Sequence, residues 1–384
     1  APAGGPAPGV EPVVEAIAGV VAGPVPASYA ELQALDAATR VRWLPVPTGP
    51  RQPALDGFEV ELLAWIAAAR CALSSQAHRR LSPGRALTST QRRLKRLADL
   101  GLLARFQLHG GDGGGVPFCC APTRPALELL GLDVRRAPVV SEETLESLRA
   151  DVHTVGWLLA LEAHAGGGLV SVLGPGRARL TPPADADAGP GSLDLGPGCH
   201  ARDFLTGDPT ETPRRPAERF LPLTPAAVAE LRVATSGGSS AMTDLLLFPS
   251  PGDRSRAVAL IERCDHLIAG WWALVPRYAR LGAPPTAVIL CPDHEAASGL
   301  VRIADEILVA CHARIGKPPE EWAYPGREGV VIAVERDLHD GRLVGYRVPS
   351  VVASARRGGI GTLRCEPIAG LALEPTRDGR PTWR

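Results

Sequence analysis

One stretch of the 384-residue chain, residues 57–120, restricts the possible folds more than any other. Three short helical patterns follow one another here, and a glycine-rich turn between two apolar segments comes after them. In the first pattern Phe58, Leu62, Trp65 and Ile66 recur at helical spacing and make one apolar stripe. Three helices followed by a glycine-tipped hairpin predict a winged helix-turn-helix domain, whose third helix can enter the major groove of DNA.

The third helical pattern, residues 88–100, has an apolar face and a polar face. We expect the apolar face to pack on the first two helices and the polar face to contact DNA. The hairpin strands are expected at 102–106 and 116–120, joined by a turn at 110–115. The polar side chains expected to hold DNA or to reach base edges are Gln91, Arg92, Arg93, Lys95 and Arg96.

Positive charge is concentrated in the same stretch. Residues 57–110 hold nine basic and three acidic side chains, a net charge of +6, whereas the whole chain carries 41 of each. Such a patch attracts a phosphate backbone and releases its counterions, so we predict double-stranded DNA as the partner. Further phosphate contacts are expected from Arg79, Arg80, Arg85 and Arg105. Arginine-rich helices are also ordinary solvated surfaces, so a protein-interaction scaffold remains an alternative.

The composition limits the class of protein. The chain is long enough for two or three domains with sizeable cores. Only Lys95 and Lys317 are lysines, and this preference for arginine predicts a GC-rich genome such as that of actinobacteria. The eight cysteines form no CxxC pair, which favours reduced thiols in the cytoplasm. No stretch approaches the ~20 apolar residues of a membrane span, so no membrane partner is expected.

The second half of the chain alternates strand and helix patterns. We expect strands at 169–173, 241–248, 257–262 and 286–291, and a β-rich stretch at 330–348. Helices are expected at 121–132, 142–164, 223–233, 266–281 and 296–314. Together these patterns predict an α+β or α/β fold class, with a winged helix first and a compact α/β domain second.

Composition and pattern divide the chain into five expected segments. The expected order is a flexible or weakly helical segment, the winged-helix domain, a connecting helix, an insert rich in Pro and Gly, and the second domain. Their expected bounds are 1–50, 51–135, 140–165, 166–222 and 223–384.

Several of these features together resemble a known family. The DNA-binding stretch, the helix with HTVGWLLALEAH, the strand with Asp244, the segment ending in Glu262 and the ILCPD strand are similar to the replication-relaxation family of bacterial plasmids and integrated mobile elements. The resemblance covers about residues 57–293. It implies a winged helix before a three-layer α/β domain like the PD-(D/E)xK nucleases, and an accessory role in replication, mobilisation or its transcriptional control. Replication or conjugation proteins are then expected partners. Because winged-helix proteins often bind paired half-sites, a homodimer is also expected.

The resemblance also implies a candidate metal pair. Asp244 and Glu262 would hold Mg²⁺ together with water and phosphate oxygens in a nuclease of that fold. Such a nuclease needs a lysine two residues after the second acid, and this chain has Cys264 there. We therefore expect a degenerate second domain that requires no cofactor. A metal-dependent nuclease with Mg²⁺ remains the alternative.

A second group of metal-binding residue types falls in the same half of the chain. Its members are Cys264, His266, Cys291, His294, Cys311 and His312. Four of them can in principle surround a zinc ion, but their spacings match no zinc finger, so buried, unrelated thiols are the favoured interpretation. The glycine runs at 110–115 and 166–168 lack the Lys-Ser/Thr of a phosphate-binding loop.

Overall fold

The structure is a computed structural model, and it shows a mixed α+β protein with two β-sheets. One sheet has four strands in the order β1-β3-β4-β2, and the other has eight in the order β11-β10-β9-β8-β7-β6-β5-β12. The structure describes residues 42–49, 53–107, 118–165, 168–175, 179–180, 223–234, 240–251, 253–268, 272–291, 293–303, 329–334, 337, 344–347, 364–367 and 381–383.

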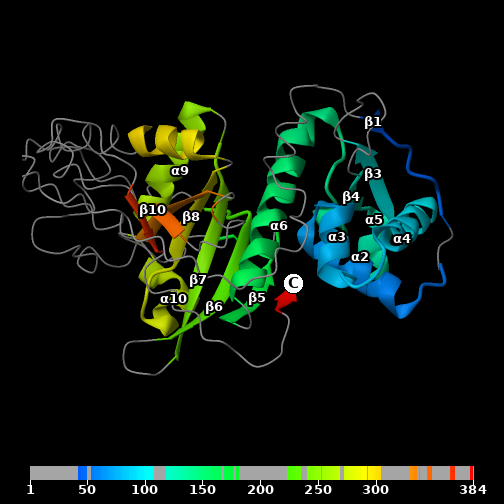
Figure 1. Ribbon diagram of the computed structural model, residues 1–384, viewed down its shortest axis with the longest axis horizontal. Helices are drawn as coiled ribbons and strands as arrows, with labels where there is room; N and C mark the ends of the chain where they lie inside the picture. The colour runs from blue at the N-terminus through cyan, green and yellow to red at the C-terminus, as the bar shows by residue number, and fades with distance from the viewer. Residues whose placement is uncertain are drawn as a thin grey trace, which may run out of the picture.

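The four-stranded sheet and the helices α2 to α5 form what we call the N-terminal body (Figure 1). Its helices are α2 (Gly57–Ala69), α3 (Ser74–Leu81), α4 (Leu87–Asp99) and α5 (Arg124–Leu129), and its strands are β1 (Arg42–Trp43), β2 (Ala72–Leu73), β3 (Leu103–Gln107) and β4 (Phe118–Pro122). Leu62, Ile66, Leu94 and Leu97 are fully or almost fully buried and join α2 and α4 in one core. The helices and strands expected at 57–120 are therefore present, and the expected turn at 110–115 lies outside the described residues.

Strand β1 lies in the segment that we expected to be flexible or weakly helical, so that expectation is wrong for Arg42 and Trp43. Both residues pair antiparallel with β3. The Trp43 ring packs against Phe106, with the ring centroids 5.2 Å apart. A buried aromatic contact of this kind fixes a short strand that local sequence propensity does not indicate.

Helix α6 (Leu145–Ala165) follows the short helix η2 (Glu142–Thr144) and joins the two halves of the protein. Every residue from Asp151 to Leu161 is buried. Val155 and Leu159 belong to the core of the N-terminal body, whereas Trp157 and Leu158 belong to the core of the large sheet. In Figure 1 the helix stands between the two bodies. The helix predicted at 142–164 is confirmed, and it is apolar on opposite faces because it packs against both.

The large sheet is mixed, and helices cover both of its faces. Its strands are β5 (Leu169–Leu173), β6 (Ala227–Ala234), β7 (Ser240–Pro249), β8 (Thr286–Cys291), β9 (Val330–Val334), β10 (Val344–Arg347), β11 (Arg364–Pro367) and β12 (Thr382–Trp383). Strands β7, β8 and β9 are parallel, and β5, β6 and β7 form an antiparallel meander. Along β7, Leu245 and Leu247 pack towards α6. Leu246 and Phe248 belong to the core on the opposite face, which carries α9 (Arg254–His266), α10 (Pro276–Leu281) and a helix at 294–303.

Three secondary-structure predictions in this half are wrong. Residues 223–233 were expected to be helical, but 227–234 form β6 because its alternate apolar residues line one face of the sheet. Residues 257–262 were expected to be a strand, but they lie in α9, where Ala257, Ile261 and Cys264 make a helical stripe. The single helix expected at 266–281 is interrupted by η6 (Trp272–Leu274), and Pro276 begins the new helix α10.

The other predictions for this half hold where the structure describes the residues. The strands at 169–173, 241–248 and 286–291 are confirmed as β5, β7 and β8, and 330–348 contains β9 and β10. The helix expected at 296–314 is described as far as residue 303. Most of the expected insert at 166–222 lies outside the described residues. In the described part of the chain no helix is long and apolar enough to cross a membrane.

The last described residues connect the two bodies. Strand β12 pairs parallel with β5 at one edge of the large sheet. The Trp383 ring packs against Trp65 of α2, with the centroids 5.5 Å apart. In Figure 1 this strand, in red, lies beside α6 on the side of the N-terminal body. The chain end therefore adds a second contact between the bodies besides α6.

Because α6 serves two cores, substitutions of neighbouring leucines on its opposite faces should both destabilise the whole protein. We expect Leu158→Ala and Leu159→Ala each to lower the free energy of unfolding by about 2–5 kcal/mol, since both side chains are buried. Urea unfolding followed by circular dichroism measures this. The exposed Ser147 on the same helix is the control, and Ser147→Ala should stay within about 0.5 kcal/mol of the wild type. A stable Leu158→Ala or Leu159→Ala variant would show that α6 supports only one body.

Candidate functional site

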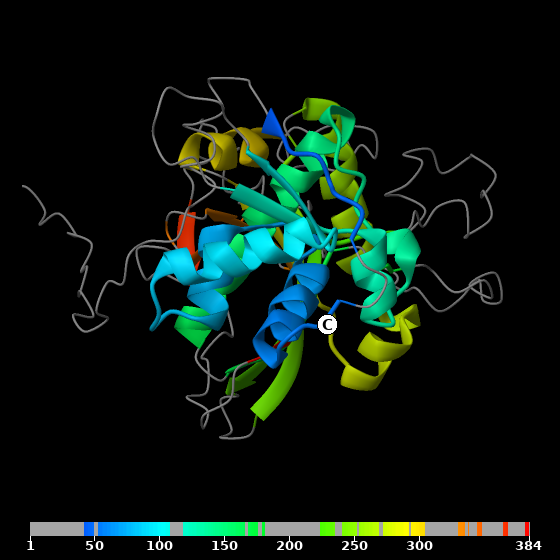
Figure 2. The same ribbon diagram turned by 90° about the vertical axis from the view of Figure 1, so that its right-hand side faces the viewer.

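Helix α4 carries most of the residues expected to contact DNA. It lies on the side of the N-terminal body away from the large sheet, as the two perpendicular views show (Figures 1 and 2). Leu94 and Leu97 point into the core, whereas Arg92 and Lys95 are exposed and Gln91 is half-buried. Lys95 forms an ion pair with Asp99 one turn along the helix, with Nζ 2.6 Å from Oδ2. Both partners are exposed, so this pair adds little stability and leaves the lysine able to change partner.

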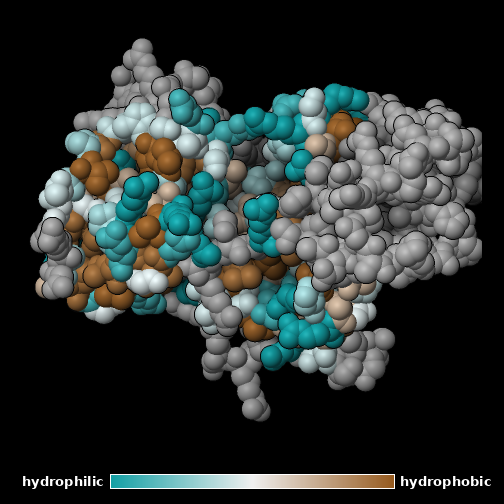
Figure 3. Space-filling model, turned by 180° about the vertical axis from the view of Figure 1, so that it is seen from behind, coloured by the Kyte–Doolittle hydropathy of each residue, from teal (hydrophilic) through white to brown (hydrophobic). Residues whose placement is uncertain are grey.

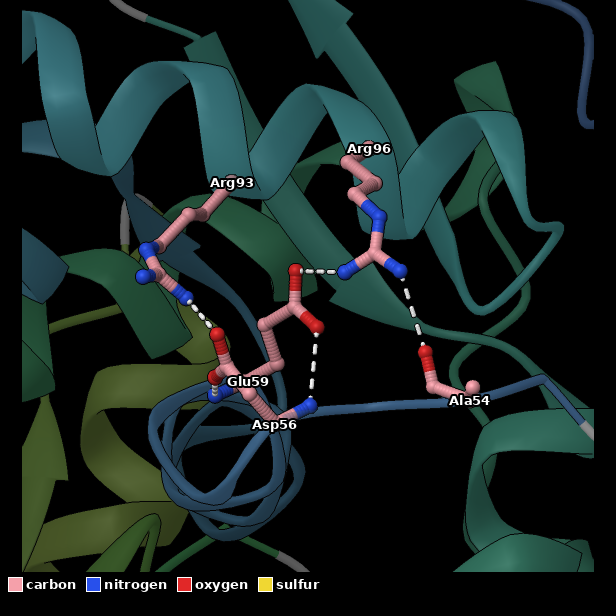
Figure 4. A network of polar contacts seen from close by, with 5 residues as sticks. All are labelled: Ala54, Asp56, Glu59, Arg93 and Arg96. Atoms are coloured by element: carbon pink, nitrogen blue, oxygen red, sulfur yellow. Dashed lines mark hydrogen bonds and ion pairs between the residues drawn. The ribbon is translucent and has the colours of Figure 1, made fainter.

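The start of α2 presents two carboxylates to α4 (Figure 4). Asp56 is the N-cap of α2, and its Oδ1 accepts a hydrogen bond from the backbone N–H of Glu59 at 2.8 Å. The Glu59 carboxylate in turn accepts from the backbone N–H of Asp56 at 3.1 Å. This reciprocal capping box satisfies free amides of the first helical turn. It also fixes both carboxylates beside α4. Glu59 is almost fully buried there.

Two of the arginines expected to read DNA bind these carboxylates (Figure 4). The Arg93 guanidinium donates to Asp56 Oδ2 at 2.5 Å and lowers the pKa of that carboxyl. Arg96 donates to Glu59, whose carboxylate raises the pKa of Arg96, and to the backbone oxygen of Ala54 at 3.0 Å. Both arginines thus fasten α4 to the beginning of α2, and they are oriented towards protein carboxylates.

The arginines of α3 are also turned inwards. Arg80, expected to contact phosphate, is 9% exposed, with Nε 3.0 Å from Glu162 of α6 and an Nη2 hydrogen bond to the Pro381 oxygen at 3.1 Å. Arg79 is half-buried, and burial lowers the pKa of its guanidinium. Arg80 therefore joins the N-terminal body, α6 and the chain end, and we leave it out of the proposed DNA surface.

Two further candidates rest on aromatic rings. The Arg85 guanidinium lies 5.7 Å from the centroid of the Phe58 ring, and Arg93 lies 5.0 Å from the same ring. Arg105 lies 4.2 Å above the Phe118 ring. Such cation–π contacts hold a guanidinium over the face of a ring. Arg85 is exposed and Arg105 is half-buried.

The structure separates seven of the nine predicted DNA contacts into two groups, while Arg79 and Arg105 are half-buried and belong to neither. Those bound to protein carboxylates of other elements are Arg80, Arg93 and Arg96. The accessible group lies on the outer face of α4 and next to its start, and consists of Arg85, Gln91, Arg92 and Lys95. The face seen in Figure 3 also shows hydrophobic residues on the surface of the N-terminal body, so this body is not basic all round.

A buried ion pair lies where the N-terminal body meets α6. Arg70, the residue that ends α2, has a positive φ of 62° and places its Nη1 atom 3.3 Å from Asp151 Oδ2. Asp151 is almost fully buried. Burial raises the pKa of its carboxyl to about 7, although Arg70 acts in the opposite direction. This carboxyl therefore titrates close to neutral pH.

A second polar cluster lies on the face of the large sheet covered by α9 and α10. Asp244 of β7 and Glu230 of β6 stand directly opposite each other in the antiparallel pair. Arg277 of α10 binds Asp244 with both ends of its guanidinium, Nε to Oδ2 at 2.5 Å and Nη2 to Oδ1 at 2.6 Å. The same Nη2 lies 3.0 Å from Glu230 Oε1, and Ser171 of β5 donates to Glu230 Oε2 at 2.6 Å.

These contacts do not fit the expected Asp244–Glu262 metal pair. Glu262 lies in helix α9 and not at a strand end, and its side chain is outside the described residues. The carboxylate opposite Asp244 is Glu230, and both oxygens of Asp244 accept from Arg277, so neither is directed to a metal ion. Among the described residues no group of three or more His, Cys, Asp or Glu side chains is arranged to hold a metal.

The predicted zinc candidates form no metal-binding group in the part of the chain that the structure describes. Cys264 and Cys291 are buried thiols in the core under α9. His294 pairs with Asp337, with Nε2 3.2 Å from Oδ2. The side chain of His266, and all of Cys311 and His312, lie outside the described residues. Buried, unrelated thiols remain the interpretation that fits the described part of this group.

Sequence reasoning missed Asp56, Glu230 and Arg277. Asp56 precedes Glu59 by three residues, and this capping-box spacing was a usable signal. Glu230 was hidden because its strand was read as a helix, although residues 229–233 alternate between apolar and charged positions. No sequence signal connects Arg277 to Asp244, because their contact depends on how α10 packs on the sheet.

No protein-family model, curated protein or solved structure matches the chain. The DNA binding proposed below therefore rests on the residues and contacts just described.

The capping-box carboxylate should be important for stability. In Glu59→Gln one of the two donors, Arg96 or the Asp56 N–H, would face an amide NH₂ group in place of an oxygen. We expect a loss of about 1–3 kcal/mol in the free energy of unfolding, measured by urea titration. Lys95→Ala removes an exposed pair on α4 and should cost less than about 0.5 kcal/mol. Equal effects in the two variants would contradict a structural role for the Glu59–Arg96 contact.

The Asp151 carboxyl predicts a pH dependence. Its pKa in the folded protein, about 7, is above the unfolded value of about 3.9, so the folded state binds the extra proton between these two pH values. The unfolding free energy should therefore fall as pH rises from about 4 to 7. Asp151→Asn cannot titrate, so the stability advantage of wild type over the variant should shrink by about 2–4 kcal/mol across that window. Parallel pH profiles of the two proteins would contradict this assignment.

Proposed function

We propose that the N-terminal body is a winged helix-turn-helix domain and that the chain binds double-stranded DNA through the outer face of α4. The observation that carries this proposal is the division of charge on α4. Arg93 and Arg96 anchor the helix to the capping box of α2, whereas Arg92 and Lys95 are exposed. The helix itself lies on the side of the N-terminal body away from the large sheet (Figure 1). An exposed, rigidly anchored helix with cationic side chains is suited to a DNA groove.

The neighbouring elements support the proposal. Helices α2, α3 and α4 are followed by the antiparallel strands β3 and β4, which is the element order of a winged helix. In this proposal Gln91 contacts base edges, and Arg85 and Arg92 contact phosphates. Base contacts provide sequence preference, and phosphate contacts provide affinity and position.

The biological setting that we propose is an accessory role in plasmid or mobile-element replication, mobilisation or its transcriptional control. It rests on the resemblance to the replication-relaxation family. The large sheet, which shares α6 with the N-terminal body, would then contact replication or conjugation proteins or a second copy of the chain. We do not propose a nuclease, since the carboxylate that its metal would need is bound to Arg277.

A salt titration of DNA binding tests the proposal. Each phosphate contact that is lost should reduce the slope of log K against log salt by about 0.9. Arg92→Ala/Lys95→Ala should therefore weaken binding to a labelled duplex and make this slope shallower by about 1–2 units, as measured by fluorescence anisotropy. The capping-box ion pairs are left intact in this variant, so α4 should keep its position.

The matched control is Arg280→Ala/Arg302→Ala, which removes two exposed arginines near the large sheet. This control should bind DNA like the wild type if the contact is made by α4. Equal weakening in both double variants would indicate unspecific attraction to the whole surface. No binding by the wild type even at low salt would overturn the proposal and favour a protein-interaction module.

A further inference from the structure

The starting observation is a pair of like charges that the fold forces together. Glu230 and Asp244 are direct partners across the β6–β7 pair and lie on the same face of the sheet. Like charges placed directly opposite each other destabilise a sheet. Asp244 is also fully buried, which makes an unpaired negative charge at this position still more unfavourable. The pair therefore requires a cation.

Arg277 supplies that cation from helix α10. Its guanidinium binds both oxygens of Asp244 and reaches Glu230 through Nη2, and Asp244 raises the pKa of the arginine. The other Glu230 oxygen accepts from the Ser171 hydroxyl. The planar fork of arginine suits this arrangement because it delivers parallel N–H groups to a carboxylate. Three strands and one helix thus meet in one connected polar network.

The next residue of α10 closes the site on its inner side. Tyr278 is buried beside Asp244, and burial together with this neighbouring carboxylate raises the pKa of its hydroxyl, so it stays protonated. Arg277 is 42% exposed and therefore forms the outer side of the network. Because Arg277 binds both oxygens of Asp244, a divalent cation would have to displace its guanidinium.

We propose that Arg277 is the permanent cation of the Glu230–Asp244 pair and takes the place that a divalent metal ion would otherwise fill. In this chain one guanidinium is shared by the two carboxylates, and it fixes α10 to the sheet at the same time. The site is therefore closed to Mg²⁺ and Mn²⁺ in the wild-type protein. Removal of the guanidinium should open it to a divalent cation, because two facing carboxylates are ligands that such ions prefer. This inference does not depend on DNA binding.

The variant Arg277→Met tests this directly, because methionine keeps an unbranched apolar stem and has no charge. Mn²⁺ binding to the full chain is followed by the electron paramagnetic resonance signal of the free ion. We expect the variant to bind Mn²⁺ with a Kd of about 0.1–1 mM, typical of a weak carboxylate site. The wild type should bind at least about tenfold more weakly. Mn²⁺ should also raise the Tm of the variant and leave that of the wild type unchanged.

Two further variants separate this site from unspecific binding. Asp244→Asn/Arg277→Met keeps the site open but removes the buried charge, and it should lose the Mn²⁺ affinity gained in Arg277→Met. Arg277→Lys keeps a cation without the fork and should also bind no Mn²⁺ at the pair. If Arg277→Met does not fold without Mn²⁺, circular dichroism spectra recorded with and without the ion test the same proposal. Mn²⁺ should then restore the folded spectrum.

Two results would overturn the proposal. One is an Asp244-dependent Mn²⁺ site in the wild type with the affinity of Arg277→Met, since Arg277 would then not close it. The other is an Arg277→Met protein that neither binds Mn²⁺ nor is stabilised by it, since the carboxylates would then not form a cation site at all.

Discussion

The structure depends on the burial of α6 on opposite faces. A helix between two cores cannot have one apolar and one polar face, because each of its turns must present apolar side chains to both cores. Val155 and Leu159 pack on one side, and Trp157 and Leu158 on the other. The polar residues near its ends are paired with the N-terminal body, Asp151 with Arg70 and Glu162 with Arg80. Because these contacts are buried, they determine where the N-terminal body lies relative to the large sheet, besides contributing to the stability of each part.

The sequence predicted the helices and strands that have a long, regular hydrophobic pattern. It did not predict the contacts between them. The three helices before residue 100, the strands β7 and β8, and α6 follow from hydrophobic periodicity alone. Residues 227–234 and 257–262 were assigned to the wrong class because short apolar runs fit both helix and strand. The difference lies in partners far along the chain, since β6 is completed by β5 and β7, and α9 by the sheet face on which it packs. Tertiary packing overrides local propensity in such segments.

The candidate site shows the same limit at the level of single side chains. Arg80 and Arg92 are both arginines on short polar helices, and no local pattern distinguishes them. Arg80 is buried because Glu162 and the chain end lie against it, whereas nothing in the described part of the chain covers Arg92 to a similar degree. Likewise, Asp244 was predicted as a metal-binding carboxylate from the family resemblance. Its partners Glu230 and Arg277 became visible only with the strand register and the packing of α10.

A charge count along the sequence therefore overstates the field that a partner experiences. Of the nine basic residues between 57 and 110, five have a carboxylate within ion-pair distance: Arg70, Arg80, Arg93, Lys95 and Arg96. Three of the partner carboxylates, Asp56, Asp151 and Glu162, lie outside residues 57–110. They were therefore not included in the net charge of +6. The positive potential must then come mainly from the outer face of α4 and from Arg85. Such a narrow source favours a partner that meets this face closely, because screening in physiological salt limits the reach of a few charges to about 8 Å.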